Sequence, residues 1–139
     1  RLALQDEPNT IPTWLPEAAS SYVPVLNAGA YSYANPWKNA GHLTGDADRA
    51  GEIETALQAR KPEQAFEGAE LALMRYAEKL TLSPGDMVEA DVAALRDAGL
   101  DDGAILEANQ IICYFNYVNR SINGLGVTTA GDIVGYYAD

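Results

Sequence analysis

Glycine, proline and aspartate residues divide this chain into short segments, and this punctuation is the sequence feature that most limits its fold. Within almost every segment the apolar residues recur at helical spacing, and the alternating runs that indicate strands are few. The pattern predicts an all-α fold. With 139 residues, of which 47% are hydrophobic, the chain is long enough to bury one core, so we expect a single helical domain over residues 1–139.

The same punctuation predicts where the helices begin and end. Pro24 should kink or break the first helix. Asp46 or Thr44 is expected to cap the third, and Gly99 is expected to end the fifth in a left-handed conformation. The tail after Gly126 carries too much glycine and tyrosine to assign. Helices are expected over residues 14–28, 33–43, 47–59, 61–80, 90–98 and 102–123.

The charge of the chain excludes two classes of partner. Lys and Arg number 9 against 20 Asp and Glu, which gives a formal net charge of −11. Nucleic acids and anionic membrane surfaces attract the opposite sign, so we expect neither as a partner. A membrane span is not expected either, because even the most apolar stretch is cut by Asn116 and ends near Arg120.

Two residue counts limit metal and disulfide chemistry. The chain has one cysteine, Cys113, and one histidine, His42. These are too few ligands for a closed zinc site, and one cysteine cannot form an intrachain disulfide. We therefore expect no metal and no cofactor, with the cytoplasm as the default location. The chain begins at Arg1 without a signal-like segment, so we expect residues upstream to be missing.

The last expected helix carries a polar stripe. Asn109, Asn116 and Asn123 recur every seven residues, with Arg120 beside them. The other faces of this helix hold aliphatic and aromatic side chains and leave only a narrow solvent side. We therefore expect the stripe to face a subunit interface or a pocket, with Asn116 and Arg120 as candidate binding residues; the alternative is the solvent side of an amphipathic helix.

The richest candidate site is a polar and aromatic turn over residues 27–37. It contains Tyr31, Ser32, Tyr33 and Asn35. Ser32 can cap a helix or act as a hydroxyl nucleophile, but a nucleophile needs a neighbouring base, so capping is favoured. Glu17, in an otherwise uncharged stretch, is either exposed at a helix start or a carboxyl whose pKa is raised by burial.

Three stretches of the chain resemble a known protein family. They are ELALMRYAEKLT at residues 70–81, VEADVAALRDAGL at residues 88–100, and YFNYVNR at residues 114–120 followed by GLGV at 124–127. In order and spacing they are similar to the peroxidase-related branch of the alkylhydroperoxidase D and carboxymuconolactone decarboxylase family. The resemblance covers nearly the whole chain. It implies an all-helical fold that assembles into trimers or hexamers, with the family's N-terminal helices missing before Arg1.

The resemblance also implies where a redox motif would lie. Peroxidase members carry Cys-x-x-Cys at the start of a helix, with a His after it and a Glu on the preceding helix. On this chain the Glu falls on Glu17, the two cysteines on Gly29 and Ser32, and the His on Pro36, so only the glutamate matches. The motif works by holding one sulfur as a thiolate, which reduces a peroxide and is resolved as a disulfide. Glycine and serine cannot do this, so thiol peroxidase chemistry is expected to fail.

The single cysteine and the single histidine are weak candidates to replace the missing redox residues. Cys113 lies between Ile112 and Tyr114 without a basic neighbour at helical spacing, so we expect a buried, inert structural residue. His42 is expected near a helix C-terminus, favourably placed against the dipole, with a role in the site as the alternative.

Three functions stay open on these residues. The first is a peroxidase-related protein without its redox residues, and the second is a non-catalytic scaffold or binding protein of the same fold. The third is a cofactor-free lyase or isomerase in which Glu17 pairs with Tyr31, Tyr33 or His42 in acid–base chemistry on a small molecule. In each case a homo-oligomer is expected, because apolar helix faces can pair while an acidic surface keeps the assembly in solution.

Overall fold

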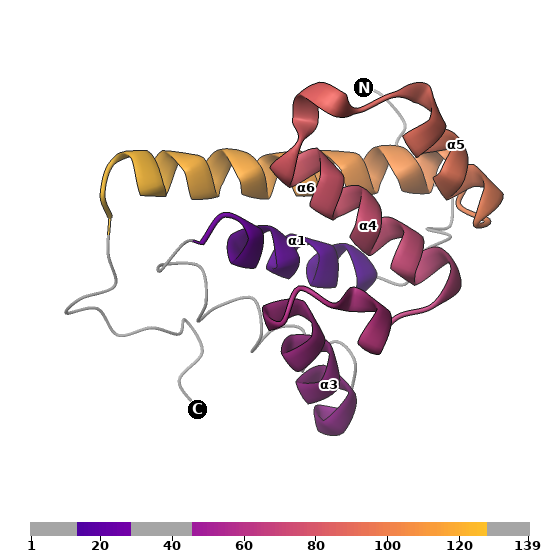
Figure 1. Ribbon diagram of the computed structural model, residues 1–139, viewed down its shortest axis with the longest axis horizontal. Coiled ribbons are helices and arrows are strands. Elements are labelled where there is room, and N and C mark those ends of the chain that lie inside the picture. The colour runs from indigo at the N-terminus through magenta and orange to yellow at the C-terminus, as the bar shows by residue number, and fades with distance from the viewer. Residues whose placement is uncertain (1–13, 29–45, 128–139) are drawn as a thin grey trace, which may run out of the picture.

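The computed structural model describes residues 14–28 and 46–127, and the expected helix over residues 33–43 lies outside them. No strand occurs in the two described ranges, which confirms the all-α prediction (Figure 1). Two 3-10 turns, η1 (Pro62–Gln64) and η2 (Pro84–Asp86), flank the helix α4. The α-helices are α1 (Trp14–Leu26), α3 (Ala47–Gln58), α4 (Gly68–Leu82), α5 (Glu89–Asp97) and α6 (Asp102–Gly124).

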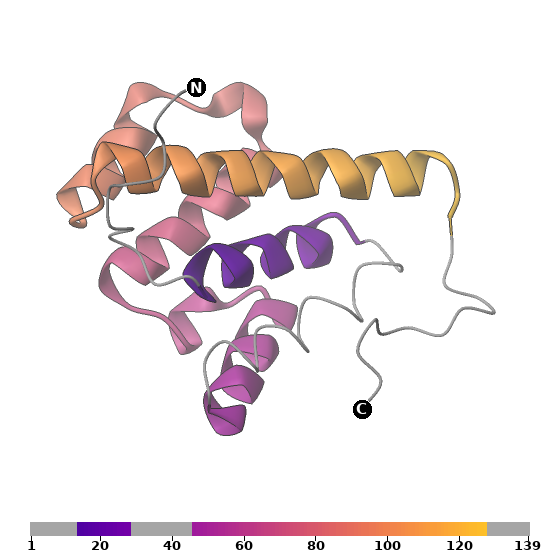
Figure 2. The same cartoon turned by 180° about the vertical axis from the view of Figure 1, so that it is seen from behind.

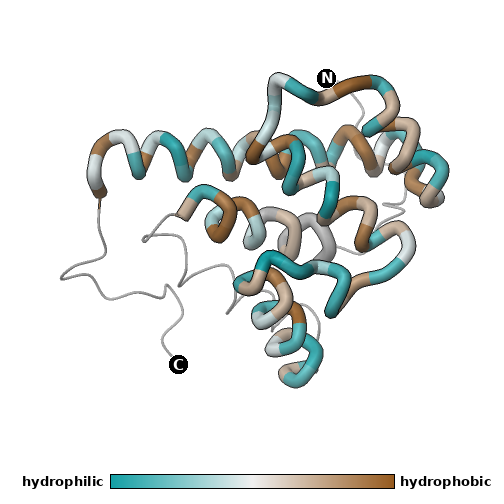
Figure 3. The backbone as a smooth tube through the Cα atoms, viewed as in Figure 1, coloured by the Kyte–Doolittle hydropathy of each residue, from teal (hydrophilic) through white to brown (hydrophobic). Residues whose placement is uncertain are grey.

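Helix α1 lies at the centre of the packing. It contacts α6, α4 and α3, while α5 packs against α4 and α6 (Figures 1 and 2). Hydrophobic and hydrophilic residues alternate along α4 and α6, as amphipathic helices require (Figure 3). The apolar positions of α1 point inward, since Tyr22 and Val23 are fully buried. Other fully buried core side chains are Leu57, Leu73, Met74, Leu95 and Ile112.

Local hydrogen bonds hold the helix N-termini where the sequence predicted them. The Asp46 carboxylate accepts from the backbone N–H groups of Asp48 (3.0 Å) and Arg49 (3.2 Å), so Asp46 is the N-cap of α3. The Asp101 carboxylate does the same for α6 by accepting from Ala104 N at 2.7 Å. Each cap satisfies donors that the first turn leaves free.

The C-terminus of α5 forms a Schellman motif. Gly99 has φ = +102°, which confirms the expected left-handed cap. Its N–H donates to Arg96 O at 2.9 Å, and Leu100 N donates to Leu95 O at 3.1 Å. This turn redirects the chain into α6, and Leu100 is buried beside it.

Of the two outcomes expected at Pro24, a kink or a break of the helix, the break is wrong. Pro24 lies in the last turn, and the helix continues to Leu26, two residues short of its expected end. Pro24 is itself fully buried, so packing holds it in the helix. The chain then leaves the helix through Asn27, whose N–H donates to Val23 O at 2.9 Å, and through Ala28, whose φ of +52° is left-handed.

The single helix expected over residues 61–80 is also wrong. The turn η1 is followed by a non-helical link, and α4 begins at Gly68. Gly68 has φ = +56°, a conformation that glycine adopts without strain and that resets the chain direction. The link buries Phe66, whose ring lies 5.4 Å from the Arg49 guanidinium. Burial of this ring against α3 takes precedence over helix continuity.

Candidate functional site

Most of the predicted site residues fall outside what the structure describes. Glu17 lies in α1, but its side chain is outside the described part. Asn116 and Arg120 lie on α6 and are described. The site is therefore built here from α6 and the elements around it. Outside the described residues lie Gly29, Tyr31, Ser32, Tyr33, Asn35, Pro36 and His42.

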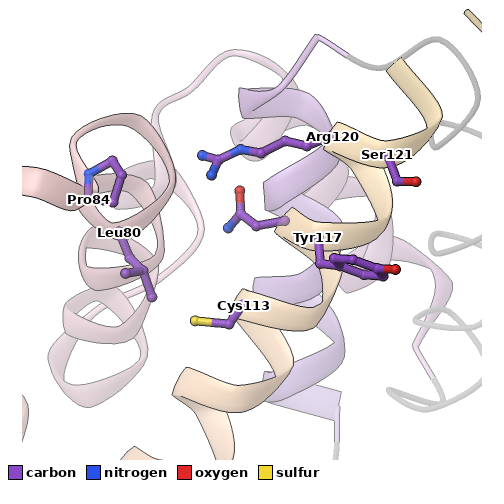
Figure 4. Close-up of a pocket in the computed structure, with 7 residues that line it drawn as sticks. Leu80, Pro84, Cys113, Tyr117, Arg120 and Ser121 are labelled. Carbon is purple, nitrogen blue, oxygen red and sulfur yellow. The ribbon is translucent and has the colours of Figure 1, made fainter. Parts of the chain in front are cut away.

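A pocket of about 470 Å³ lies between α6 and the end of α4. Leu80 and Pro84 form one wall, and the side chains of α6 form the other (Figure 4). Cys113 and Arg120 point from α6 toward this wall. The residues that line the pocket from α6 are Cys113, Asn116, Tyr117, Arg120 and Ser121.

Asn116 connects three helices beside the pocket. Its amide nitrogen donates to Thr81 Oγ1 on α4 (2.9 Å) and to Ile112 O on α6 (3.1 Å). Its amide oxygen accepts from Asn27 Nδ2, just after α1, at 3.0 Å. Both N–H donors are thus used inside the chain, and Asn116 is only 6% exposed. The residue is primarily a structural link, and its proposed part in binding is limited to lining the pocket.

The other two asparagines of the stripe, Asn109 and Asn123, also form hydrogen bonds within the chain. Asn109 Nδ2 donates to Tyr76 Oη on α4 at 2.8 Å, and Asn123 Nδ2 donates to Asn27 O at 3.2 Å. The stripe therefore forms hydrogen bonds to α1 and α4 of its own chain, and Asn116 lines a pocket, which was one of the two surroundings expected for it. Asn116 is buried and supplies partners to polar groups of the neighbouring helices, whereas Asn123 makes its bond at an exposed position.

Arg120 is held at the pocket by a hydrogen bond, without an acidic partner among the described residues. Its Nη2 donates to Thr81 O at 2.9 Å. Arg75 and Arg96, by contrast, pair with Glu63 and Asp102, each at 2.7 Å. Within residues 14–28 and 46–127, Arg120 forms no ion pair. A guanidinium has five N–H donors, so the hydrogen bond to Thr81 leaves most of them available to a ligand.

Cys113 is exposed, so the expectation of a buried cysteine is wrong. Neighbouring helix positions differ by about 100° in direction, so the fully buried Ile112 does not imply a buried Cys113. The thiol lies 3.9 Å from Asn109 Oδ1, a weak contact in which sulfur is the donor. Cys113 is therefore an accessible thiol at the pocket.

A buried tyrosine–carboxylate pair lies between α1 and α4, and the sequence analysis missed it. Tyr22 Oη donates to Glu78 Oε2 at 2.8 Å, and Glu78 also accepts from Arg75 at 3.4 Å. Burial, and then the hydrogen bond to the carboxylate, raise the pKa of Tyr22 well above its ordinary value. The two residues are 56 positions apart, so no local spacing could indicate their contact.

The described ranges contain no group of three or more His, Cys, Asp or Glu side chains that could hold a metal ion. Within the same ranges no helix has the length and apolar content needed to cross a membrane.

Comparison with known proteins supports the fold. No family model matches the sequence, and no curated protein matches it. The structure is similar to the crystal structure of an uncharacterized peroxidase-related protein from Silicibacter sp. TM1040, with a TM-score of 0.69 at 18% sequence identity. The alignment covers 88% of this chain and 61% of that one, so this chain spans less than two thirds of its neighbour. The chain therefore has the all-α fold of a peroxidase-related protein.

Proposed function

We propose that this chain is an alkylhydroperoxidase-like, peroxidase-related protein without two-cysteine peroxidase chemistry, and that it serves as a binding or scaffold protein. The observation that carries the proposal is the cysteine content: Cys113 is the one cysteine in the 139 residues. A two-cysteine cycle needs one thiolate to attack the peroxide and a second thiol to resolve the oxidised sulfur. This chain has no second thiol of its own.

The surroundings of Cys113 also disfavour a redox role. Reactive cysteines are stabilised as thiolates by a helix N-terminus or a cationic neighbour. Cys113 lies in the middle of α6, and its partner, the Asn109 amide oxygen, accepts a hydrogen bond from the thiol and so does not stabilise a thiolate. Arg120 lies about two turns further along α6 and donates to Thr81 O.

The test is the consumption of cumene hydroperoxide with dithiothreitol as reductant. We expect the chain and its Cys113→Ser variant to match the rate without protein. A variant with Gly29→Cys, Ser32→Cys and Pro36→His, built on Cys113→Ser so that no other sulfur takes part, is expected to turn over. Turnover by the unmodified chain that Cys113→Ser abolishes would overturn the proposal.

We further propose that the protein is a cytoplasmic homo-oligomer, a trimer or hexamer. An exposed, unpaired thiol at Cys113 is suited to a reducing compartment. The outer side of α6 exposes Leu106, Tyr114 and Tyr117, which a second copy could cover.

A further inference from the structure

The α6 side of the pocket lies in a stretch of the chain that has no acidic residues. The whole chain carries a net charge of −11, yet residues 108–127 include no Asp or Glu. Arg120 is the one charged residue in that stretch. An anion that approaches the C-terminal half of α6 therefore meets less repulsion than it would near the acid-rich segments of this protein.

Arg120 is held in a position to bind an anion. Its hydrogen bond to Thr81 O anchors the guanidinium at the end of α4, and Figure 4 shows the side chain extending across the pocket toward Pro84. The remaining N–H groups have no carboxylate partner in the described part of the chain. A fixed, planar guanidinium with free donors matches a carboxylate, which it can bind through two parallel hydrogen bonds.

The rest of the pocket suits an apolar body. Leu80 and Pro84 face α6 across the pocket, and Tyr117 borders it from α6. Asn116 has both amide donors committed to Thr81 and Ile112, so it does not compete with Arg120 for the anion. The volume of about 470 Å³ lies within the range of small-molecule sites, roughly 300–1,000 Å³.

We infer that this pocket binds a small monocarboxylic acid, with the carboxylate on Arg120 and the hydrocarbon part against Leu80 and Pro84. The single cation Arg120 neutralises one negative charge. The acidic residues outside residues 108–127 disfavour a ligand that carries two negative charges. This inference deepens the proposed binding function and rests on it, because it assigns Cys113 no part in chemistry.

Cys113 supplies a direct reporter of occupancy. It lines the pocket and is the single cysteine, so its alkylation by iodoacetamide, a neutral reagent, reports access to the site. We expect hexanoate to slow this alkylation in a saturable manner, as measured by mass spectrometry. Hexanol presents the same hydrocarbon without the charge, and we expect its affinity to be about tenfold lower, since a charged hydrogen bond is lost.

Arg60 provides a matched control for Arg120. It also donates to a backbone carbonyl, that of Val25 at 3.3 Å, and it too forms no ion pair in residues 14–28 and 46–127, but it does not line the pocket. We expect Arg120→Gln to remove the protection by hexanoate, Arg120→Lys to keep part of it because the charge remains, and Arg60→Gln to leave it intact. Circular dichroism of each variant checks that α6 is still folded.

Three results would overturn the inference: no protection of the unmodified chain at any hexanoate concentration, equal protection by hexanol, or equal protection of Arg120→Gln. Protection by self-association would grow with protein concentration, whereas protection by hexanoate grows with ligand concentration. The hexanoate result is independent of the peroxidase test. Turnover of peroxide by the unmodified chain would refute the proposed function but would not bear on carboxylate binding at Arg120. Absence of hexanoate binding would refute the Arg120 site but would not bear on the missing peroxidase activity.

Discussion

Tyr22 forms a hydrogen bond to Glu78 that joins α1 to α4. The tyrosine is fully buried, and the carboxylate is also bonded to Arg75 at the surface. The neutral phenol is the form that donates to Glu78, and its ionisation would place two negative charges side by side. The pair therefore stabilises the fold only while Tyr22 keeps its proton.

The raised pKa of Tyr22 predicts a loss of stability in alkali. In the unfolded chain Tyr22 ionises near its ordinary value of 10, whereas the folded protein holds the proton to higher pH. The contribution is therefore complete below pH 10 and is lost as the pH rises above it. We expect urea unfolding to show a steeper fall in stability above this pH for the unmodified chain than for Tyr22→Phe.

At neutral pH the same variant is expected to be less stable by about 1 kcal/mol, because it loses one hydrogen bond. The other tyrosines are common to both proteins, so their ionisation cancels in the comparison. Parallel stability curves through the alkaline range would show that the pKa of Tyr22 is not raised in the folded protein.

The sequence can single out a residue when the feature that marks it lies in the same helix. The sequence placed Asn116 and Arg120 among the binding candidates because polar residues stood out on an apolar helix. Their shared partner Thr81 lies on another helix, with Asn116 and Thr81 35 positions apart, and no sequence spacing indicates such a contact. The burial of Cys113 was predicted wrongly for a related reason: which neighbours cover a helix face is decided by tertiary packing.

Helix ends show the same division between local and distant causes. Asp46 and Gly99 were predicted because a cap and a left-handed turn depend on residues within one turn of the chain. The break before Gly68 depends on the burial of Phe66 in the core, and the continuity of α1 through Pro24 depends on the packing around that proline. Helix propensity alone predicts neither the break before Gly68 nor the continuity of α1 through Pro24.

Helix α6 is joined to its neighbours by Asn116, and removing this link is expected to cost stability. Asn116→Leu would remove the donor to the Thr81 hydroxyl and leave the Asn27 amide with only its bond to Val23 O, next to the core. Because buried polar groups without partners are unfavourable, we expect a loss of about 2 kcal/mol in urea unfolding. Gln110→Leu is the control: it also replaces an amide side chain by leucine, at an exposed position of α6, and should stay within about 0.5 kcal/mol.

A double-mutant cycle tests whether the loss arises from the Asn116 to Thr81 contact. Thr81→Val removes the acceptor hydroxyl, so in the combined variant Asn116→Leu should cost less than it does alone. Strictly additive losses would show that the two side chains stabilise the protein independently.

At the scale of the molecule, the fold class was predictable and the site was not. Helical periodicity extends through most of the chain, and the resulting all-α structure matches that of a peroxidase-related protein at only 18% identity. Periodicity survives such divergence because many residues satisfy each buried position. The pocket requires the particular approach of α6 to the end of α4, and Leu80 and Pro84 carry no sequence signal of a site.

The outer side of α6 predicts self-association of the whole protein. Leu106, Tyr114 and Tyr117 are 55%, 61% and 72% exposed, and no Asp or Glu occurs in residues 108–127. Two copies with a net charge of −11 repel each other, and this uncharged, partly aromatic side of α6 is where they can approach with the least repulsion. We therefore expect sedimentation equilibrium at micromolar concentrations to show species heavier than the 14.9 kDa chain.

Tyr114→Glu tests the surface directly, because it places a carboxylate on this side without altering a pocket residue. It is expected to shift the equilibrium toward the 14.9 kDa species. Gln64→Glu makes an acidic substitution on η1, which packs against α3 and α4, and should leave the assembly unchanged. If the unmodified chain sediments as a single 14.9 kDa species throughout, the aromatic side of α6 does not hold copies together, and its exposed tyrosines need another explanation.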